Sequence, residues 1–181
     1  DHVSDLTSAY VEYHPPRQRG DFYAAHRAVK TVLISIIEAE SPVHIDTAVR
    51  RTASAWGITR AGHRVRDVVM SAAGSAISEG SILRRGTFLY RTGESQVAVR
   101  RNAPGGDTRK AFEIAPEEIA EAARLILQDF IRLSRDDLII ATARLLGFER
   151  TGTDVRRVMS DGIDVLVDSG VAMVEHDAIF L

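Results

Sequence analysis

The sequence predicts a mainly α-helical protein with small β-hairpins, an α+β fold, built as tandem winged helix-turn-helix repeats. Three observations predict it: a repeat at a constant offset of ninety residues, helical apolar periodicity in each copy, and a hairpin pattern that ends each copy. The stretch WGITRAGHRVRDVVM thus corresponds to LGFERTGTDVRRVM. Ten identical pairs share the offset: Asp46/Asp136, Thr52/Thr142, Ala53/Ala143, Gly57/Gly147, Arg60/Arg150, Gly62/Gly152, Val65/Val155, Arg66/Arg156, Val68/Val158 and Gly80/Gly170.

The first copy begins with an amphipathic helix. Apolar residues recur at helical spacing over residues 26–40, which predicts a helix there. Pro42 ends this helix and starts a short extended segment rich in β-branched residues. We expect Asp46 to cap a second helix that runs to Trp56, and Gly57 to end it in the left-handed conformation.

A third helix is expected to start near Arg60 or Ala61 and to run to about Glu79, with Gly80 as its stop. The segment SILRRGTFLY then predicts two short strands with a turn at the Arg-Gly pair. The buried stripe of the third helix is expected to advance by three and four residues, and it consists of Val65, Val68, Val69, Ala72 and Ala76.

The second copy has the same order. Pro116, followed by two glutamates, is a strong helix start, and this helix should extend to about Leu133. Ser134 opens the next helix with a capping box, and Gly147 closes it. The third helix is expected over residues 152–169, and VAMVEHDAIFL closes the copy as a hairpin that turns at its His-Asp pair.

The remaining residues define four segments. Residues 1–25 are rich in aromatic side chains and are expected to form an arm that packs on the first copy, residues 26–90. Residues 91–112 contain a Pro-Gly-Gly turn and little apolar periodicity, so they are expected to form a linker, with VAVRR as a possible extra strand. The second copy occupies residues 113–181.

Composition limits the class of protein. The chain has 181 residues, of which 45% are hydrophobic and 27% charged, and no run approaches the roughly 20 apolar residues of a membrane span. The absence of cysteine excludes disulfides and cysteine-ligated zinc, which fits a cytoplasmic location. Because the chain begins at Asp1 instead of methionine, we expect it to be a piece of a longer protein.

The sequence contains no motif that predicts catalysis. It has no GxxxxGK[ST] phosphate loop, no HExxH and no GxSxG elbow, and its six histidines are scattered, so no catalytic residue, cofactor or metal is predicted. His44 is expected to pack or bond locally at a strand end. Asp136 and Asp137 fall in the first turn of a helix, where carboxylates interact well with the helix dipole.

The net charge of −2 conceals a strong asymmetry. Residues 26–112 carry 14 Arg and Lys against 7 Asp and Glu, whereas residues 113–181 carry 7 against 14. Clustered cations gain affinity for a phosphate backbone through counterion release, and an acidic surface is repelled by it. The sequence therefore predicts that only the first copy contacts nucleic acid.

The candidate side chains lie on the third helix, which a winged helix lays in the major groove, and at the wing tip. The predicted nucleic-acid-binding residues are Arg60, His63, Arg64, Arg66, Arg84 and Arg85. Two structural alternatives remain open at this point. Arg66 has carboxylates at positions 67 and 79 within reach, and the repeated pair Arg60 and Arg150 could bond the last carbonyls of the preceding helix. In the second copy, acidic residues surround the matching arginines.

The words PVHID, WGITRAG, APEEI and LLGFERTG carry a family resemblance. Over about residues 26–181 the chain resembles the domain of unknown function at the C-terminus of large bacterial superfamily 1 helicase-related proteins. In those proteins a helicase core and a segment similar to the very-short-patch-repair endonuclease come first. The resemblance implies an accessory module of an ATP-dependent enzyme, with those upstream domains as partners, and it assigns no binding residues.

We therefore expect a non-catalytic module that contacts DNA or RNA through the basic first copy, while the acidic copy docks on protein. The alternative is a protein-protein interaction or domain-docking module without nucleic-acid contact.

Overall fold

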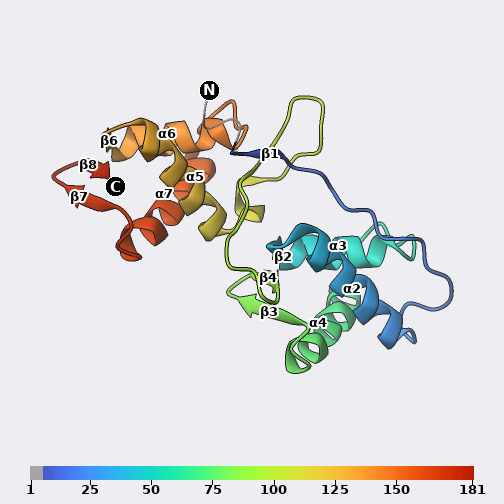
Figure 1. Cartoon of the computed structure of the whole chain (residues 1–181). Helices are drawn as coiled ribbons and strands as arrows, with labels where there is room; N and C mark the ends of the chain where they lie inside the picture. Colours follow the sequence, from blue (N-terminus) through green and yellow to red (C-terminus); the bar gives the residue numbers. More distant parts are fainter. Residues whose placement is uncertain (1–5) are drawn as a thin grey trace. The chain divides into compact units, whose positions relative to one another are not determined.

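The computed structural model describes residues 6–181, and the chain forms two compact units (Figure 1). One unit is Glu12–Ser95, with 12 Arg and Lys against 8 Asp and Glu, and we call it the basic unit. The other joins the residues up to Val11 with Gln96–Leu181, carries 11 against 17, and is called the acidic unit. The described residues form six α-helices and small sheets, which confirms the predicted α+β class.

The basic unit packs three helices against a small antiparallel sheet. Its strands pair in the order β2-β4-β3, and apolar side chains from all three helices fill its core. In chain order the elements are α2 (His26–Glu40), β2 (Val43–His44), α3 (Ile45–Ser54), α4 (His63–Ser78), β3 (Ile82–Arg85) and β4 (Phe88–Arg91).

The acidic unit repeats this order, with strands paired as β6-β8-β7, and adds a parallel pair of two-residue strands, β1 and β5. Its elements are β1 (Ser8–Ala9), β5 (Arg100–Arg101), the 3₁₀ helix η1 (Ala111–Glu113), α5 (Pro116–Asp129), β6 (Leu133–Ser134), α6 (Arg135–Leu145), α7 (Thr153–Asp168), β7 (Met173–Glu175) and β8 (Ala178–Phe180).

The offset of ninety holds in the backbone and in the core. Gly57 and Gly147 follow equivalent helices with φ of +76° and +88°, a region in which a Cβ is disfavoured. Ser134 caps α6 as predicted, accepting a hydrogen bond from the Asp137 amide at 3.1 Å. The buried positions of α4 and α7 also match: Val69/Met159, Ala72/Gly162, Ala73/Ile163 and Ala76/Leu166.

Several local expectations were wrong. Val68 and Val158 are only half-buried, because the buried face of each helix centres on the next position. His44 caps α3 in place of Asp46, since its Nδ1 accepts a hydrogen bond from the Asp46 amide at 3.1 Å. This is the local bond expected of His44, and its ring also packs edge-on against Phe88.

Element ends differ by a few residues as well. The helix α4 starts at His63, two to three residues later than expected, because an extended Gly62 precedes it. The helix α5 ends at Asp129, four residues early, because Phe130 is extended. The turn of the β3–β4 hairpin lies at Gly86 and Thr87, where Gly86 has a φ of +56°.

The N-terminal arm is divided between the two units. Residues 12–25 pack on the basic unit, where the Gln18 amide donates to the Ala55 carbonyl at 2.7 Å and the Tyr13 amide donates to the Glu40 carboxylate at 2.6 Å. Ser8–Ala9 instead pairs with Arg100–Arg101 in the acidic unit. The first five residues of the expected arm lie outside the described residues.

The segment expected to be a linker contributes most of its length to the acidic unit. Val99 is buried, and the Asn102 amide donates to the Leu146 carbonyl at 3.0 Å, at the turn that closes α6. In the basic unit, the Gln18 amide makes a corresponding hydrogen bond to the Ala55 carbonyl at the end of α3. Each unit therefore carries an extended segment on the end of its second helix. Among the described helices, none has both the length and the apolar character needed to cross a bilayer.

Candidate nucleic-acid interface

The first turn of α4 is strongly cationic. Its buried face starts at Val65, so His63 and Arg64 lie exposed on the outer face, and Arg60 is exposed in the loop just before the helix. The first turn contains no acidic residue, although the N-terminus of a helix carries the positive end of its dipole. The equivalent helix α7 has Asp154 there. The cations of α4 therefore lack the carboxylate that α7 supplies.

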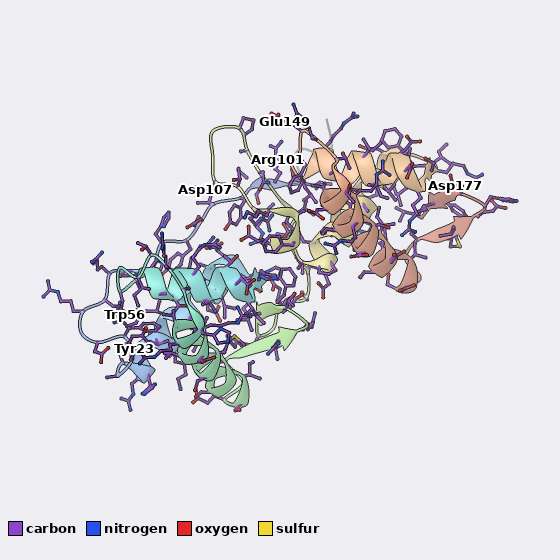
Figure 2. All side chains as sticks on the ribbon, turned by 180° about the vertical axis from the view of Figure 1, so that it is seen from behind. Tyr23, Trp56, Arg101, Asp107, Glu149 and Asp177 are labelled. Carbon is purple, nitrogen blue, oxygen red and sulfur yellow. The ribbon has the colours of Figure 1, made fainter. Side chains whose placement is uncertain are left out.

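Arg64 rests on an aromatic ring. Its guanidinium carbon lies 4.8 Å from the centre of the Tyr23 ring, within the range of a cation-π interaction. Phe22 packs edge-on against both Tyr23 and Trp56, with ring centres 5.4 Å apart in each case. Figure 2 shows Tyr23 and Trp56 at the same end of the basic unit. Tyr23 was expected from the sequence to pack on the first copy as part of the N-terminal arm, and its contact with Arg64 was not predicted.

Arg66 has a structural partner. It donates a hydrogen bond to Asp46 on α3, and neither Asp67 nor Glu79, the two carboxylates considered from the sequence, is that partner. The hydrogen bond from Arg66 holds the pKa of Asp46 below its ordinary value, although burial opposes the charged form, and the positive charge of Arg66 contributes further. The same pair recurs at the offset of ninety as Arg156 and Asp136, 2.7 Å apart. Arg66 is therefore a repeated helix-to-helix contact.

The β3–β4 hairpin, predicted from the sequence to be a wing, carries two exposed arginines on β3. Arg84 donates from its Nε to the carbonyl of Gly86 at 3.0 Å, which holds it across the turn. The guanidinium carbon of Arg85 lies 4.9 Å from the centre of the Tyr90 ring on β4. Arg60 makes no side-chain hydrogen bond or ion pair with any described residue, including the carbonyls that end α3. The positive charges of Arg60, Arg64 and Arg84 therefore have no carboxylate partner among the described residues.

The arginines of the acidic unit are mostly neutralised. Arg157 lies 3.8 Å from Asp161 one turn away on α7, and Arg132 lies 3.2 Å from Glu175 on β7. Arg135 donates to Ser160 at 2.9 Å and also pairs with Asp164. The β7–β8 hairpin of this unit turns at His176 and Asp177, and Figure 2 labels Asp177 on this hairpin. The equivalent surface therefore carries ion pairs and net negative charge.

Two arginines of the expected linker, the buried Arg109 and the partly buried Arg100, surround one buried carboxylate. Glu118 on α5 accepts hydrogen bonds of 2.8 Å from Arg109 and from both the amide and the guanidinium of Arg100. Burial opposes the charged form of Glu118, but the bonds from Arg109 and the charge of Arg100 hold its pKa below the ordinary value. The Tyr10 ring covers the Arg109 guanidinium at 4.6 Å. These two cations stabilise the unit and are not available to a ligand.

Comparison with known proteins identifies one similarity. A family model described as a protein of unknown function (DUF3320) matches residues 21–67. The matched stretch contains Tyr23, the helices α2 and α3, and the start of α4 with Arg64, and it ends before the wing. No curated protein matches the chain, and no solved structure matches it. Among the described residues, no group of three His, Asp or Glu side chains could hold a metal ion.

Proposed function

We propose that both units are winged helices and that this chain is a non-catalytic accessory module whose basic unit contacts nucleic acid. The contacts are made by the first turn of α4 and by the wing of β3 and β4. One observation carries the proposal: Arg64 in the first turn of α4 has no described carboxylate partner, whereas the equivalent position of α7 is Asp154 and Arg157 on that helix lies 3.8 Å from Asp161.

The charges at the start of α4 favour the binding of phosphate groups. A cationic first turn is unfavourable at the positive end of a helix dipole, and a phosphate group placed there relieves it. The arginines of the wing lie on the same unit and can bind a second part of the backbone. When these arginines bind phosphates, condensed counterions leave the nucleic acid, so the affinity falls as the salt concentration rises. The slope of log affinity against log salt concentration is about −0.9 for each phosphate contacted on duplex DNA.

The wider context belongs to the same proposal. From the resemblance of the sequence alone, we propose that the module belongs to a large bacterial helicase-related protein in the cytoplasm, with the helicase and nuclease domains upstream in the same chain. In that setting the module adds DNA contacts to an enzyme that performs the ATP-dependent chemistry elsewhere. The phosphates of RNA offer the same surface an alternative ligand.

The test compares charge reversals in the two units. Glutamate replaces Arg60, Arg64, Arg84 and Arg85 in one variant, and Arg156 and Arg157 in a matched control. We expect the first variant to lose DNA affinity and to show a shallower salt dependence, while the control changes little because its surface already repels phosphate. Fluorescence anisotropy with duplex, single-stranded and forked DNA at two salt concentrations measures both, and circular dichroism checks folding.

The second candidate function is protein docking. The acidic unit exposes apolar side chains near its hairpin, with Ile131 93% exposed and Met173 54% exposed, and exposed apolar groups of this kind favour contact with protein. If no DNA binds even at low salt, or if both reversals leave binding unchanged, the nucleic-acid proposal is wrong and the docking module without nucleic-acid contact takes its place.

A further inference from the structure

Tyr23 is held in a fixed position at the protein surface. Its amide donates to the Asp21 carboxylate at 3.0 Å, and the Ala25 amide donates to the Phe22 carbonyl at 3.3 Å, so the turn before α2 is closed by its own hydrogen bonds. The buried Phe22 ring meets the Tyr23 ring at 84°. Tyr23 nevertheless remains 40% exposed. Binding of a ligand to the Tyr23 ring therefore costs little conformational entropy of the side chain.

The partner of Tyr23 is a cation of the candidate interface. Arg64 belongs to the first turn of α4, and its planar guanidinium lies next to the aromatic ring. An aromatic side chain beside a basic groove is the arrangement with which proteins bind unpaired nucleotides, because every base has a π-face and every nucleotide has a phosphate.

Comparison of the two copies distinguishes the pair formed by Arg64 and Tyr23 from contacts that hold the fold together. The ion pair of Arg66 with Asp46 recurs in the acidic unit, as expected of a contact that holds α4 against α3. The position equivalent to Arg64 is Asp154, so the acidic unit has no counterpart of the pair formed by Arg64 and Tyr23. The pair thus occurs only in the basic unit, where Arg64 has no described carboxylate partner, and this indicates a role in binding.

We propose that Tyr23 and Arg64 form a stacking platform for an unpaired base, so that the basic unit prefers DNA with a single-stranded tail to a blunt duplex. This inference rests on the proposed function, since α4 and the wing must first bind the backbone. The platform stacks the first unpaired base beside the duplex, and Arg64 also binds its phosphate. The chemical class recognised is then a junction between duplex and single-stranded DNA.

The experiment measures the ratio of affinities for tailed and blunt DNA. The full chain is titrated against a blunt duplex and the same duplex with a 3′ or a 5′ tail, each tail carrying 2-aminopurine at its first unpaired position. The variants are Tyr23→Phe, which keeps the ring, and Tyr23→Leu, which keeps apolar area without a π-face. Phe112→Ala is the matched control, because Phe112 is 45% exposed and lies 5.9 Å from Lys110 in the acidic unit.

We expect the wild type to quench 2-aminopurine in at least one tail and to bind that DNA more tightly than the blunt duplex. Tyr23→Leu should lower the affinity ratio by roughly 5- to 100-fold, the range that loss of one stacked base gives. Tyr23→Phe and Phe112→Ala should retain both the ratio and the quenching.

Two different failures can be told apart. If blunt and tailed DNA bind equally to the wild type, or if Tyr23→Leu retains the ratio and the quenching, the platform is wrong while the backbone contacts stand. If no DNA binds, or if charge reversal on α4 and the wing has no effect, the proposed function itself is wrong and the platform fails with it.

Discussion

The glycines that close the second helix of each unit should respond differently to the same substitution. Gly57 and Gly147 both have positive φ, so alanine at either position costs about 1–2 kcal/mol of backbone strain, offset by about 0.4–1 kcal/mol from the more restricted unfolded chain. At Gly57 the added Cβ meets the far end of the Arg17 side chain at 2.9 Å, and that side chain can move aside. Gly57→Ala should therefore cost about 1 kcal/mol.

Gly147→Ala should be much more damaging. Its Cβ would overlap the carbonyl oxygen of Asn102, which belongs to backbone and cannot rotate away. Asn102 is tied to the Leu146 carbonyl at 3.0 Å, and its side chain makes bonds of 2.8 and 2.9 Å with the backbone of Arg109. Losing these bonds at about 1 kcal/mol each, added to the strain, gives a cost of about 3–5 kcal/mol.

Urea unfolding measures both costs. Trp56 is the only tryptophan in the sequence and lies in the basic unit, so its fluorescence follows that unit, while far-ultraviolet circular dichroism follows the helices of both. Gly147→Ala should move the circular dichroism transition to lower urea more than it moves the fluorescence transition. Equal and small effects of the two substitutions would show that the segment around Asn102 does not pack on the α6 turn as the structure places it.

Three further predictions concern stability, each measured by thermal or urea unfolding. Gly162→Ala should destabilise by about 1–3 kcal/mol because its Cβ would overlap a side chain of α5, whereas Gly74→Ala, in open space on α4, should stabilise by about 0.5–1 kcal/mol; the same sign for both would contradict the packing. Glu118→Gln should cost about 3–5 kcal/mol by leaving the buried guanidinium of Arg109 and the partly buried one of Arg100 without their anion. Because the folded-state pKa of Glu118 is lowered, this contribution should be complete above pH 4.5 and lost as pH falls through the folded-state pKa; a pH-independent difference from wild type would refute this. Val69→Ala should cost about 1–3 kcal/mol and Val68→Ala less, because Val69 is buried and Val68 only half-buried. The reverse order would show that the buried face of α4 centres on Val68, as expected from the sequence.

The sequence alone determined the repeat, the order of elements and the sign of the charge on each copy. These features depend on interactions between residues that are close in the sequence. Such local effects are apolar periodicity, proline and glycine at helix ends, and side chains that cap a helix within three residues, and none of them depends on the tertiary fold. Ser134 at the start of α6 and Gly147 at its end were predicted for this reason. The element ends and the buried face were less accurate, since Val68 and Val69 fit a helical stripe almost equally well.

Only the tertiary structure decided which cations are engaged and which side chains lie together. Asp46 and Arg66 are twenty residues apart and meet because α3 and α4 cross, and Glu118 draws Arg100 and Arg109 from a segment without periodic pattern into the acidic unit. Tyr23 and Arg64 are separated by forty-one residues and by two complete helices. Their contact depends on the packing of the whole basic unit, and a pattern that extends over three or four residues carries no information about it.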